Sequence, residues 1–155
     1  MPEQNTIRPT PYNSNDPYIY ISFAHKDIDE AVPIITRMQS DGYRIWYDEG
    51  IVPGSVWVED IASHVEQCSC FIALISKNYL ESKNCLNELY YSSSLSDIGI
   101  CILLVYLEDA PIPAGMEMRL GRLQAIFKYK YTSIEQVYEK LYETESIRTC
   151  CKAKE

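Results

Sequence analysis

One acidic residue stands out for the chemistry that its position would allow. Glu88 lies in the segment Asn84-Cys85-Leu86-Asn87-Glu88-Leu89, near the expected start of a helix. A carboxylate fixed in a partly dry cleft can stabilise positive charge that builds up on a reacting carbon atom. About thirty residues earlier, an aromatic run from Trp46 breaks into a Gly/Pro-bounded loop that leads into an amphipathic helix at Trp57. Loop and carboxylate both lie where a strand passes into a helix, which suggests a single site.

Several familiar catalytic motifs are missing from the chain. It has no Gly-x-Gly-x-x-Gly after its first strand, no Gly-x-x-x-x-Gly-Lys and no Gly-x-Ser-x-Gly. A hydride-transferring dehydrogenase and a P-loop nucleotidase are therefore disfavoured. A receiver domain would need a phosphorylatable aspartate after its third strand, where Ser76 stands instead.

The elements that would position Glu88 alternate along the chain. Apolar or aromatic runs typical of strands occupy residues 18–23, 43–47, 70–75, 100–107 and 123–129. Helical patterns lie between them, at residues 27–42, 57–67, 78–95 with an interruption near 82–84, and 133–143. Asp27 and Glu30 have capping-box spacing, Pro33 suggests that the regular helix begins a little later, and Gly42 suits its end. Such alternation predicts a doubly wound α/β sheet that binds ligands at the carboxyl ends of its strands.

Length and composition predict one domain with two polar ends. The 155 residues, 46% of them hydrophobic, suffice for a single buried core. Residues 1–17 contain four prolines among Asn, Thr and Ser and are expected to form a flexible leader. The domain should then span residues 18–143, and residues 144–155 should form a polar tail that frays.

Charge and cysteine usage narrow the class of partner and the compartment. A net charge of −8 argues against a nucleic-acid binder, which needs a basic surface. The cysteines at positions 68, 70 and 101 lie in or beside apolar runs, which favours free thiols in the cytoplasm over disulfides. No spacing indicates a metal site, and neither a signal segment nor a membrane span is expected.

Three short segments together resemble a known family. In order, they are the strand-like Tyr18-Ile-Tyr-Ile-Ser-Phe-Ala-His-Lys-Asp27, the loop around Pro53-Gly54-Ser55, and Cys85-Leu86-Asn87-Glu88-Leu89. At this spacing they are similar to the Toll/interleukin-1 receptor (TIR) domain, specifically its bacterial form, over roughly residues 18–143. The resemblance implies a flavodoxin-like three-layer fold, with a central parallel sheet of about five strands and helices on both faces.

The resemblance also implies an activity. In TIR proteins that cleave NAD⁺, a glutamate at the position of Glu88 carries catalysis. Ordinary glycoside hydrolysis uses two carboxylates, but nicotinamide already leaves as a neutral molecule without being protonated. One carboxylate is then sufficient in principle, and the resemblance favours this role for Glu88 over that of a surface glutamate on a helix. NAD⁺ would be the substrate, no further cofactor is implied, and the product would be ADP-ribose or a cyclic ADP-ribose isomer.

Further residues are implied to contact the substrate, each with a structural alternative. Phe23 could stack on nicotinamide or fill the core, Ala24 follows it, and His25 could contact the ligand or only be solvated. Asp48 opens the loop and could simply cap a turn. The remaining implied residues are Ser55 in that loop, Trp57, which could line the cleft or hold its helix to the sheet, Cys85, and Ser92, which could orient Glu88 or be exposed.

The rival interpretation is a non-catalytic adaptor. In the family, residues 48–56 form the BB loop, which packs against a neighbouring TIR domain, and the helices at 57–67 and 78–95 are implied to join in self-association. Enzyme and adaptor share one fold, so architecture does not separate them. For a bacterial enzyme, the resemblance implies anti-phage signalling in the cytoplasm, with the product sensed or consumed by a downstream effector.

Overall fold

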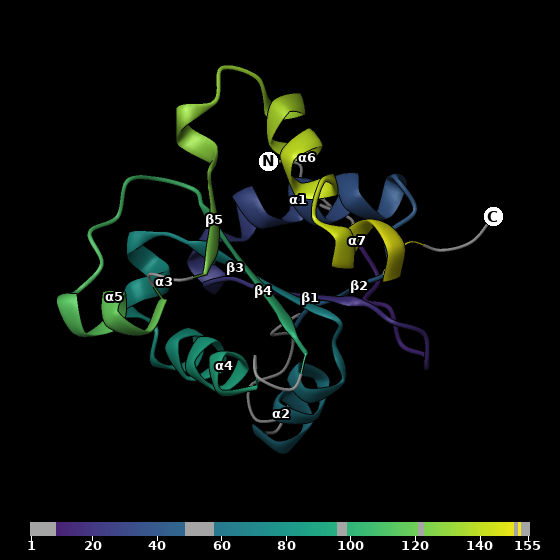
Figure 1. Cartoon of the computed structure of the whole chain (residues 1–155), viewed down its shortest axis with the longest axis horizontal. Helices are drawn as coiled ribbons and strands as arrows, with labels where there is room; N and C mark the ends of the chain where they lie inside the picture. The colour runs from purple at the N-terminus through teal and green to yellow at the C-terminus, as the bar shows by residue number, and fades with distance from the viewer. Residues whose placement is uncertain (1–8, 49–57, 96–98, 121–122, 151, 153–155) are drawn as a thin grey trace, which may run out of the picture.

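The chain folds around a sheet of five parallel strands (Figure 1). In this computed structural model the described residues are 9–48, 58–95, 99–120, 123–150 and 152. The strands are β1 (Ile19–Ser22), β2 (Ile45–Trp46), β3 (Cys70–Ile75), β4 (Cys101–Tyr106) and β5 (Gln124–Phe127). Their order is β2-β1-β3-β4-β5, and every neighbouring pair is parallel. The predicted parallel sheet is therefore confirmed.

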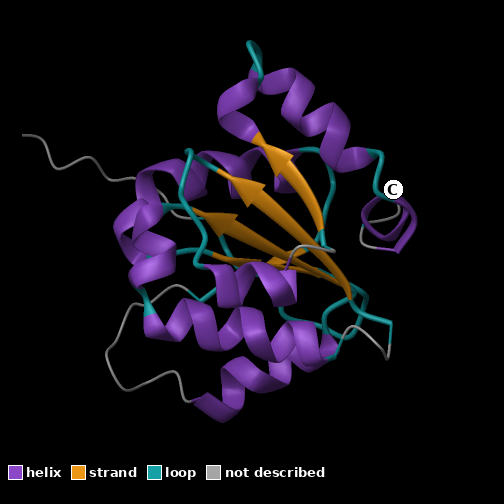
Figure 2. Ribbon diagram, turned by 60° about the vertical axis from the view of Figure 1, so that its left-hand side comes forward, coloured by secondary structure: helices purple, strands orange, loops and turns teal. Residues whose placement is uncertain are grey.

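Helices cover both faces of this sheet, as Figure 2 shows. One face packs against α1 (Ile28–Ser40), α6 (Ile134–Tyr142) and α7 (Glu145–Cys150). The other face packs against α2 (Val58–Gln67), α3 (Lys77–Glu81), α4 (Lys83–Ser94) and α5 (Ala114–Leu120). The three layers match the flavodoxin-like fold expected from the sequence. None of the helices in the described ranges is long and apolar enough to cross a membrane.

Strand β1 supplies side chains to both layers. It lies between β2 and β3, with Tyr20 paired to Trp46 on one side and to Phe71 on the other. Ile19 and Ile21 belong to the core under α1, whereas Tyr20 belongs to the core under α4. Because side chains alternate along a strand, Ser22 projects to the same face as Tyr20. This face carries the candidate site.

Helix α1 begins earlier than the sequence suggested and has no capping box. It starts at Ile28, directly after a short 3₁₀ turn at His25–Asp27, and continues through Pro33. Proline removes only one hydrogen bond there, and that bond would have ended on the carbonyl of the exposed Asp29. The Asp27 side chain makes no capping bond, because it accepts hydrogen bonds from Ser76, the N-cap of α3, and from Asn78 within α3 instead. Gly42, with φ of 97°, ends the helix as predicted.

The predicted interruption in the helix after β3 is confirmed. Helix α3 ends at Glu81 and α4 begins at Lys83, with Ser82 extended between them. The hydroxyl of Ser76 accepts a hydrogen bond from the Tyr79 amide at 3.0 Å, and that of Ser82 accepts one from the Cys85 amide at 3.2 Å. These two serine caps let the chain turn twice within a few residues. The second turn brings Glu88 to the carboxyl edge of the sheet.

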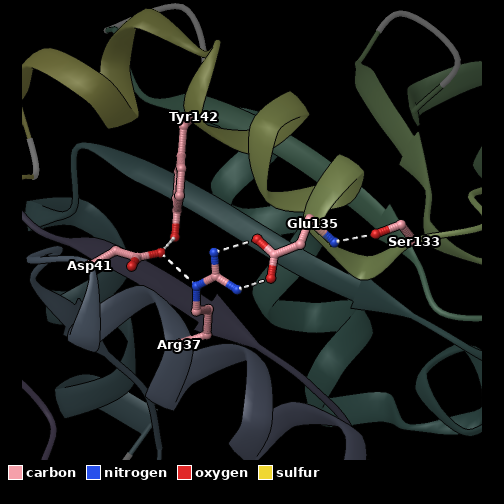
Figure 3. Close-up of polar contacts among 5 residues, drawn as sticks. All are labelled: Arg37, Asp41, Ser133, Glu135 and Tyr142. Atoms are coloured by element: carbon pink, nitrogen blue, oxygen red, sulfur yellow. Dashed lines mark hydrogen bonds and ion pairs between the residues drawn. The ribbon is translucent and has the colours of Figure 1, made fainter.

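A polar network fastens α6 to the C-terminal part of α1 (Figure 3). Arg37 donates to both carboxylate oxygens of Glu135, at 2.6 and 2.7 Å, and also to Asp41 at 2.9 Å. The Tyr142 hydroxyl donates to the same oxygen of Asp41 at 2.6 Å. Residues far apart in sequence are thus joined on the face of the sheet remote from α4.

Parts of both chain ends pack on the domain, although the sequence predicted a flexible leader and a fraying tail. Residues 145–150 form α7, and Ile147 is fully buried in the core, which a purely polar pattern would not provide. Near the start, the Tyr12 amide donates to the Ile45 carbonyl at 2.7 Å, and the Tyr47 hydroxyl donates to the Pro9 carbonyl. Cys68, Cys70, Cys85 and Cys101 form no disulfide with any of the described residues.

Candidate functional site

A cavity of about 320 Å³ opens at the carboxyl edge of β1, between that strand and the helices α3 and α4. It lies where the parallel sheet was predicted to bind ligands. The described residues that line it come from the end of β1 and the 3₁₀ turn after it, from the end of β2, and from α2, α3 and α4. They are Ile21, Ser22, Phe23, Ala24, His25, Lys26, Asp48, Ile61, Asn78, Glu81, Ser82, Asn84, Cys85 and Glu88.

Glu88 lies on the inner wall of this cavity, half-buried on α4. Its Oε1 accepts a hydrogen bond of 2.6 Å from the hydroxyl of Tyr20. Burial raises the pKa of Glu88 from 4.5 to about 7, and the negative charge of Asp48 acts in the same direction. The hydrogen bond from Tyr20 and the polar hydroxyl of Ser22 lower this pKa and so act against both effects. The carboxylate is therefore ionised in only part of the molecules at neutral pH, unless a positively charged ligand stabilises the anion.

Hydroxyl groups form a buried layer beneath the carboxylate. The Ser22 hydroxyl lies 2.9 Å from that of Tyr79, which is fully buried. Tyr79 in turn donates to the carbonyl oxygen of Cys85 at 3.2 Å. Burial raises the pKa of the Tyr79 phenol well above its ordinary value, so this phenol stays neutral. The layer joins β1, α3 and α4 directly below the cavity.

A second set of hydrogen bonds supports the opposite wall. Asp27 is buried and accepts hydrogen bonds from the hydroxyl of Ser76 and, at 2.8 Å, from the side-chain amide of Asn78. Asn78 also lines the cavity. Asp27 thus fixes the amide group of Asn78 at the cavity wall, where it can present polar atoms to a ligand.

Both charge signs occur at the mouth of the cavity. His25 Nε2 lies 3.9 Å from Asp48 Oδ2, and His25 is exposed. Lys26 is exposed beside it, and Glu81 lines the cavity as well. With Glu88 inside, the described wall carries more acidic than basic groups, which favours a ligand with a positively charged part.

A second, more apolar cavity adjoins the first. It measures about 370 Å³ and lies between α2 and α4. Ile61, Asn84 and Glu88 border both cavities. The other described residues of its wall are Ala62, Val65, Asn87 and Tyr91. Glu88 therefore stands between a polar and an apolar hollow.

The structure brings together most of the residues singled out from sequence. Phe23, Ala24, His25, Asp48, Cys85 and Glu88 all line the first cavity. Phe23 is also buried in the core under α1, with its ring centre 6.0 Å from that of Tyr47, so the expected core-filling role is present. Ser55 and Trp57, together with residues 49–56 of the predicted loop, lie outside the described residues.

Ser92 fits neither of its two sequence interpretations. It is fully buried, and its hydroxyl donates to the Leu89 carbonyl at 2.7 Å. This bond within the helix uses the hydroxyl proton that was expected to orient Glu88, and burial contradicts the exposed alternative.

Sequence reasoning missed Tyr20, Ser22 and Asn78. The alternation along residues 18–23 already placed Tyr20 and Ser22 on one face of a strand, but no local pattern showed that Glu88 lies opposite them. No sequence pattern indicated that Asn78 belongs to the site, because its hydrogen-bond partner Asp27 is distant in sequence and was assigned to a helix cap.

No group of three or more His, Cys, Asp or Glu side chains that could hold a metal ion occurs among the described residues. Residues that could contact an organic ligand are present, since the cavity offers an aromatic ring, an amide and a carboxylate at Phe23, Asn78 and Glu88. The arrangement suits the binding of a partly cationic small molecule and the stabilisation of positive charge beside Glu88.

A family model described as "TIR domain" matches residues 19–142. Among solved structures, the TIR domain of the Toll-related receptor TRR-2 from Hydra magnipapillata has a TM-score of 0.62 at 15% identity, over 84% of this chain and 98% of that one. The CMP N-glycosidase BcmB from Clostridium botulinum has a TM-score of 0.53 at 16% identity, over 79% and 97%.

The TIR domains of the activated Roq1 resistosome, which recognises the pathogen effector XopQ, have a TM-score of 0.55 at 14% identity, over 84% of this chain and 81% of that one. At these identities each likeness is one of fold. No curated protein matches the chain at a significant level.

Proposed function

Because this chain belongs to the TIR domain family, we propose that it is an NAD⁺ nucleosidase, an enzyme that breaks the bond between nicotinamide and ribose. One observation carries the proposal: the Glu88 carboxylate lies on the wall of a cavity at the carboxyl edge of the sheet and is held there by Tyr20. NAD⁺ would be the substrate, and no additional cofactor takes part.

The chemistry of NAD⁺ suits a single carboxylate. Nicotinamide is bound to ribose as a pyridinium cation and departs as a neutral molecule, so no general acid is needed for the leaving group. As the bond breaks, positive charge develops on the anomeric carbon of the ribose. An ionised Glu88 next to that carbon would stabilise the charge in a site that excludes much of the water.

The protonation state of Glu88 fits this role once substrate is bound. Its pKa of about 7 leaves part of the free protein with a neutral glutamic acid. The pyridinium of NAD⁺ brings a positive charge into the cavity, and an opposite charge within a few ångströms favours the ionised carboxyl. Substrate binding would thus increase the fraction of molecules in the reactive form.

The cavity volume supports binding of part of a dinucleotide. About 320 Å³ falls at the lower end of the range for small-molecule sites, roughly 300–1,000 Å³. The nicotinamide riboside half would occupy this cavity, with Phe23 available to pack against the nicotinamide ring and Asn78 to bind a polar group. His25 and Lys26 at the mouth would face the phosphates.

Two outcomes are open to the ribosyl cation. Attack by water gives ADP-ribose, and attack by a hydroxyl or nitrogen of the same molecule gives a cyclic ADP-ribose isomer. The choice depends on how the adenosine end folds back and on how well water is excluded. The solved relative whose name describes a CMP N-glycosidase cleaves a related bond in its own substrate, which supports N-glycosidic chemistry on this fold.

The biological role that we propose is bacterial anti-phage signalling in the cytoplasm, with a downstream effector that senses or consumes the product. This part of the proposal rests on family analogy. The resemblance to the TIR domains of a resistosome is consistent with a defence role.

One observation favours the alternative of a TIR–TIR adaptor. The apolar cavity between α2 and α4 is lined by Ile61, Ala62, Val65 and Tyr91, and these are the two helices implied in self-association. Apolar side chains there could pack against a second copy through its loop at residues 48–56. The two functions are compatible if assembly completes the catalytic site.

The deciding experiment is NAD⁺ consumption by concentrated wild-type protein beside Glu88→Gln, with folding of both checked by circular dichroism. Products are separated by chromatography and identified by mass. Turnover in the wild type that disappears in Glu88→Gln supports the enzyme, and the product mass separates hydrolysis from cyclisation. Absence of turnover in concentrated wild-type protein, with NAD⁺ in excess, would favour the adaptor.

A further inference from the structure

The Tyr20 hydroxyl donates to Glu88 at 2.6 Å, and Tyr20 stands on β1, an inner strand of the sheet. We propose that Tyr20 is the positioning residue for Glu88: its hydroxyl fixes the direction of the carboxylate and stabilises its anionic form. The consequence for turnover rests on the proposed NAD⁺ nucleosidase function. The positioning itself is a property of the protein that can be measured without a reaction.

The side chain of Tyr20 has almost no freedom to move. It is fully buried on β1. Its ring centre lies 5.0 Å from that of Phe71, nearly parallel at 16°, and 5.0 Å from that of Trp46, at 41°. Two aromatic neighbours from the flanking strands thus hold the ring in place. The position of the Tyr20 hydroxyl is therefore fixed, and the Glu88 carboxylate orients itself to accept the hydrogen bond.

The hydrogen bond has the length of a strong one. At 2.6 Å from oxygen to oxygen, it lies within the range of about 2.5–2.7 Å typical of a hydroxyl that donates to an ionised carboxylate. Burial raises the pKa of the Tyr20 phenol well above its ordinary value, and the charge of Glu88 adds to this effect. The phenol therefore stays protonated, and so remains a donor, at neutral pH.

Ser22 places a second hydroxyl on the same face of β1. It stands two residues after Tyr20 and is buried, and its polar interaction with Glu88 opposes the effect of burial on the pKa of the carboxyl. Charged and titratable groups from the other elements also face Glu88. They are His25 and Lys26 from the 3₁₀ turn, Asp48 after β2, Tyr79 and Glu81 on α3, and Cys85 and Tyr91 on α4. Among these, Asp48 opposes ionisation of Glu88.

The test is direct titration of Glu88 by carbon-13 NMR, with the side-chain carboxyl carbons of glutamate labelled and the Glu88 signal assigned by its loss in Glu88→Gln. Tyr20→Phe keeps the aromatic packing and removes only the hydroxyl. We expect the titration midpoint of Glu88 to rise by about one pH unit, which is a tenfold change in the protonation equilibrium. An unchanged midpoint in a folded variant would overturn the proposal.

Tyr18→Phe is the matched control. Tyr18 lies on the same face of the chain, two residues before Tyr20, and its hydroxyl donates to the His64 carbonyl at 2.6 Å. Removing that hydroxyl also deletes one hydrogen bond of a buried tyrosine, but it leaves Glu88 untouched. The Glu88 midpoint should stay at its wild-type value. An equal shift of the Glu88 midpoint in both variants would show a general disturbance of the packing and would contradict the specific role of Tyr20.

A measurement on the wild-type protein covers the case in which Tyr20→Phe does not fold. With tyrosine ring carbons labelled, the hydroxyl-bearing carbon of Tyr20 should change its chemical shift with the same midpoint as Glu88. A Tyr20 signal that does not follow Glu88 would count against the proposal.

Turnover gives an independent reading. In Tyr20→Phe, the rising limb of the pH profile for NAD⁺ cleavage should move to higher pH by the same interval as the NMR midpoint. If the wild type turns over no NAD⁺ yet Tyr20→Phe shifts the titration, the enzyme proposal fails and the positioning role stands. If turnover depends on Glu88 but neither the titration nor the pH profile moves, the positioning role fails alone.

Discussion

Ser22 on β1 and Tyr79 on α3 share a buried hydrogen bond of 2.9 Å beneath the cavity, although 57 positions separate them in the chain. Tyr79 also donates to the Cys85 carbonyl, so one phenol ties the strand to the start of α4. The position of Glu88 depends on this tie, since Glu88 lies one helical turn after Cys85.

Tyr79→Phe is expected to destabilise the fold by about 1–2 kcal/mol, because it leaves buried polar partners with one hydrogen bond fewer. Urea denaturation followed by circular dichroism measures this. Tyr12→Phe is the comparison, since its hydroxyl bonds to the exposed Asp16 and its removal should cost less. Equal stability of Tyr79→Phe and wild type would show that the buried bond contributes little.

Glu88→Gln should lose turnover and gain stability at alkaline pH. The folded protein holds the Glu88 proton more tightly than the unfolded chain does, because burial raises the pKa from 4.5 to about 7. Protonated Glu88 therefore stabilises the fold fully below its pKa in the unfolded chain, 4.5. This contribution is lost as the pH rises to its pKa in the folded protein, about 7. The loss amounts to roughly 3 kcal/mol, and glutamine avoids it.

Denaturation of wild type and Glu88→Gln at several pH values measures this difference. The two proteins should approach one another in stability at acidic pH, diverge as the pH rises from about 4.5 to about 7, and keep a constant difference above that. Turnover should fall by about 100-fold or more in the variant, which is the loss typical of removing an electrostatic catalytic group. A constant stability difference across the range would contradict the titration of Glu88.

Asp48→Asn should shift the pH profile of turnover to lower pH. If ionised Glu88 is required, kcat/KM rises with pH and reaches half its maximum near the pKa of Glu88, about 7. The charge of Asp48 raises that pKa, so its removal favours the anion, opposite to the effect expected for Tyr20→Phe. His25→Ala, which removes the neighbour of Asp48 at 3.9 Å, serves as the control for disturbance of the cavity mouth. A profile that moves upward in Asp48→Asn would be incompatible with this account.

Activity per molecule should increase with protein concentration if a second copy helps to complete the site. The apolar cavity between α2 and α4 supplies a surface for such a contact. Ala62→Glu, which places a charge in this cavity, should weaken the concentration dependence while Glu88 and its hydrogen bond remain. Specific activity that stays constant down to nanomolar protein would rule out a shared site.

Arg37→Met should lower the thermal midpoint of unfolding, because it breaks the paired hydrogen bonds to Glu135 and the bond to Asp41. The network is exposed, so added salt should reduce the difference between variant and wild type. Thermal melts at low and high salt measure both effects. Lys140→Met, which removes only an exposed pair with Glu143, should change the midpoint less.

Much of the architecture could be predicted from local pattern. The buried runs that became β3 and β4 are continuous because helices cover both faces of the sheet, and the predicted break between α3 and α4 appears at Ser82. Glu88 and the end of β1 were placed at one edge because parallel strands end together. Helix α7 was missed because, among its side chains whose burial is described, Ile147 alone is buried in the core.

What the sequence could not provide were contacts between distant residues. Asp27 had the spacing of a helix cap, yet its carboxylate is used by Ser76 and Asn78 about fifty positions later. In the sequence, Tyr20 is one more aromatic residue of a strand, whereas in the structure its hydroxyl donates a hydrogen bond to Glu88. Side-chain pairs of this kind depend on the register between elements, which hydrophobic periodicity does not encode.

The strand order has a consequence for how the protein is made and altered. β1 is first in the chain but lies between β2 and β3, so its pairing is complete only once residue 73 has been synthesised. Among the described residues, every one that lines the more polar of the two cavities at Glu88 stands at or before position 88. The wall of that cavity is thus encoded in the first 88 residues, and β4 supports it from behind through the core that it shares with α4.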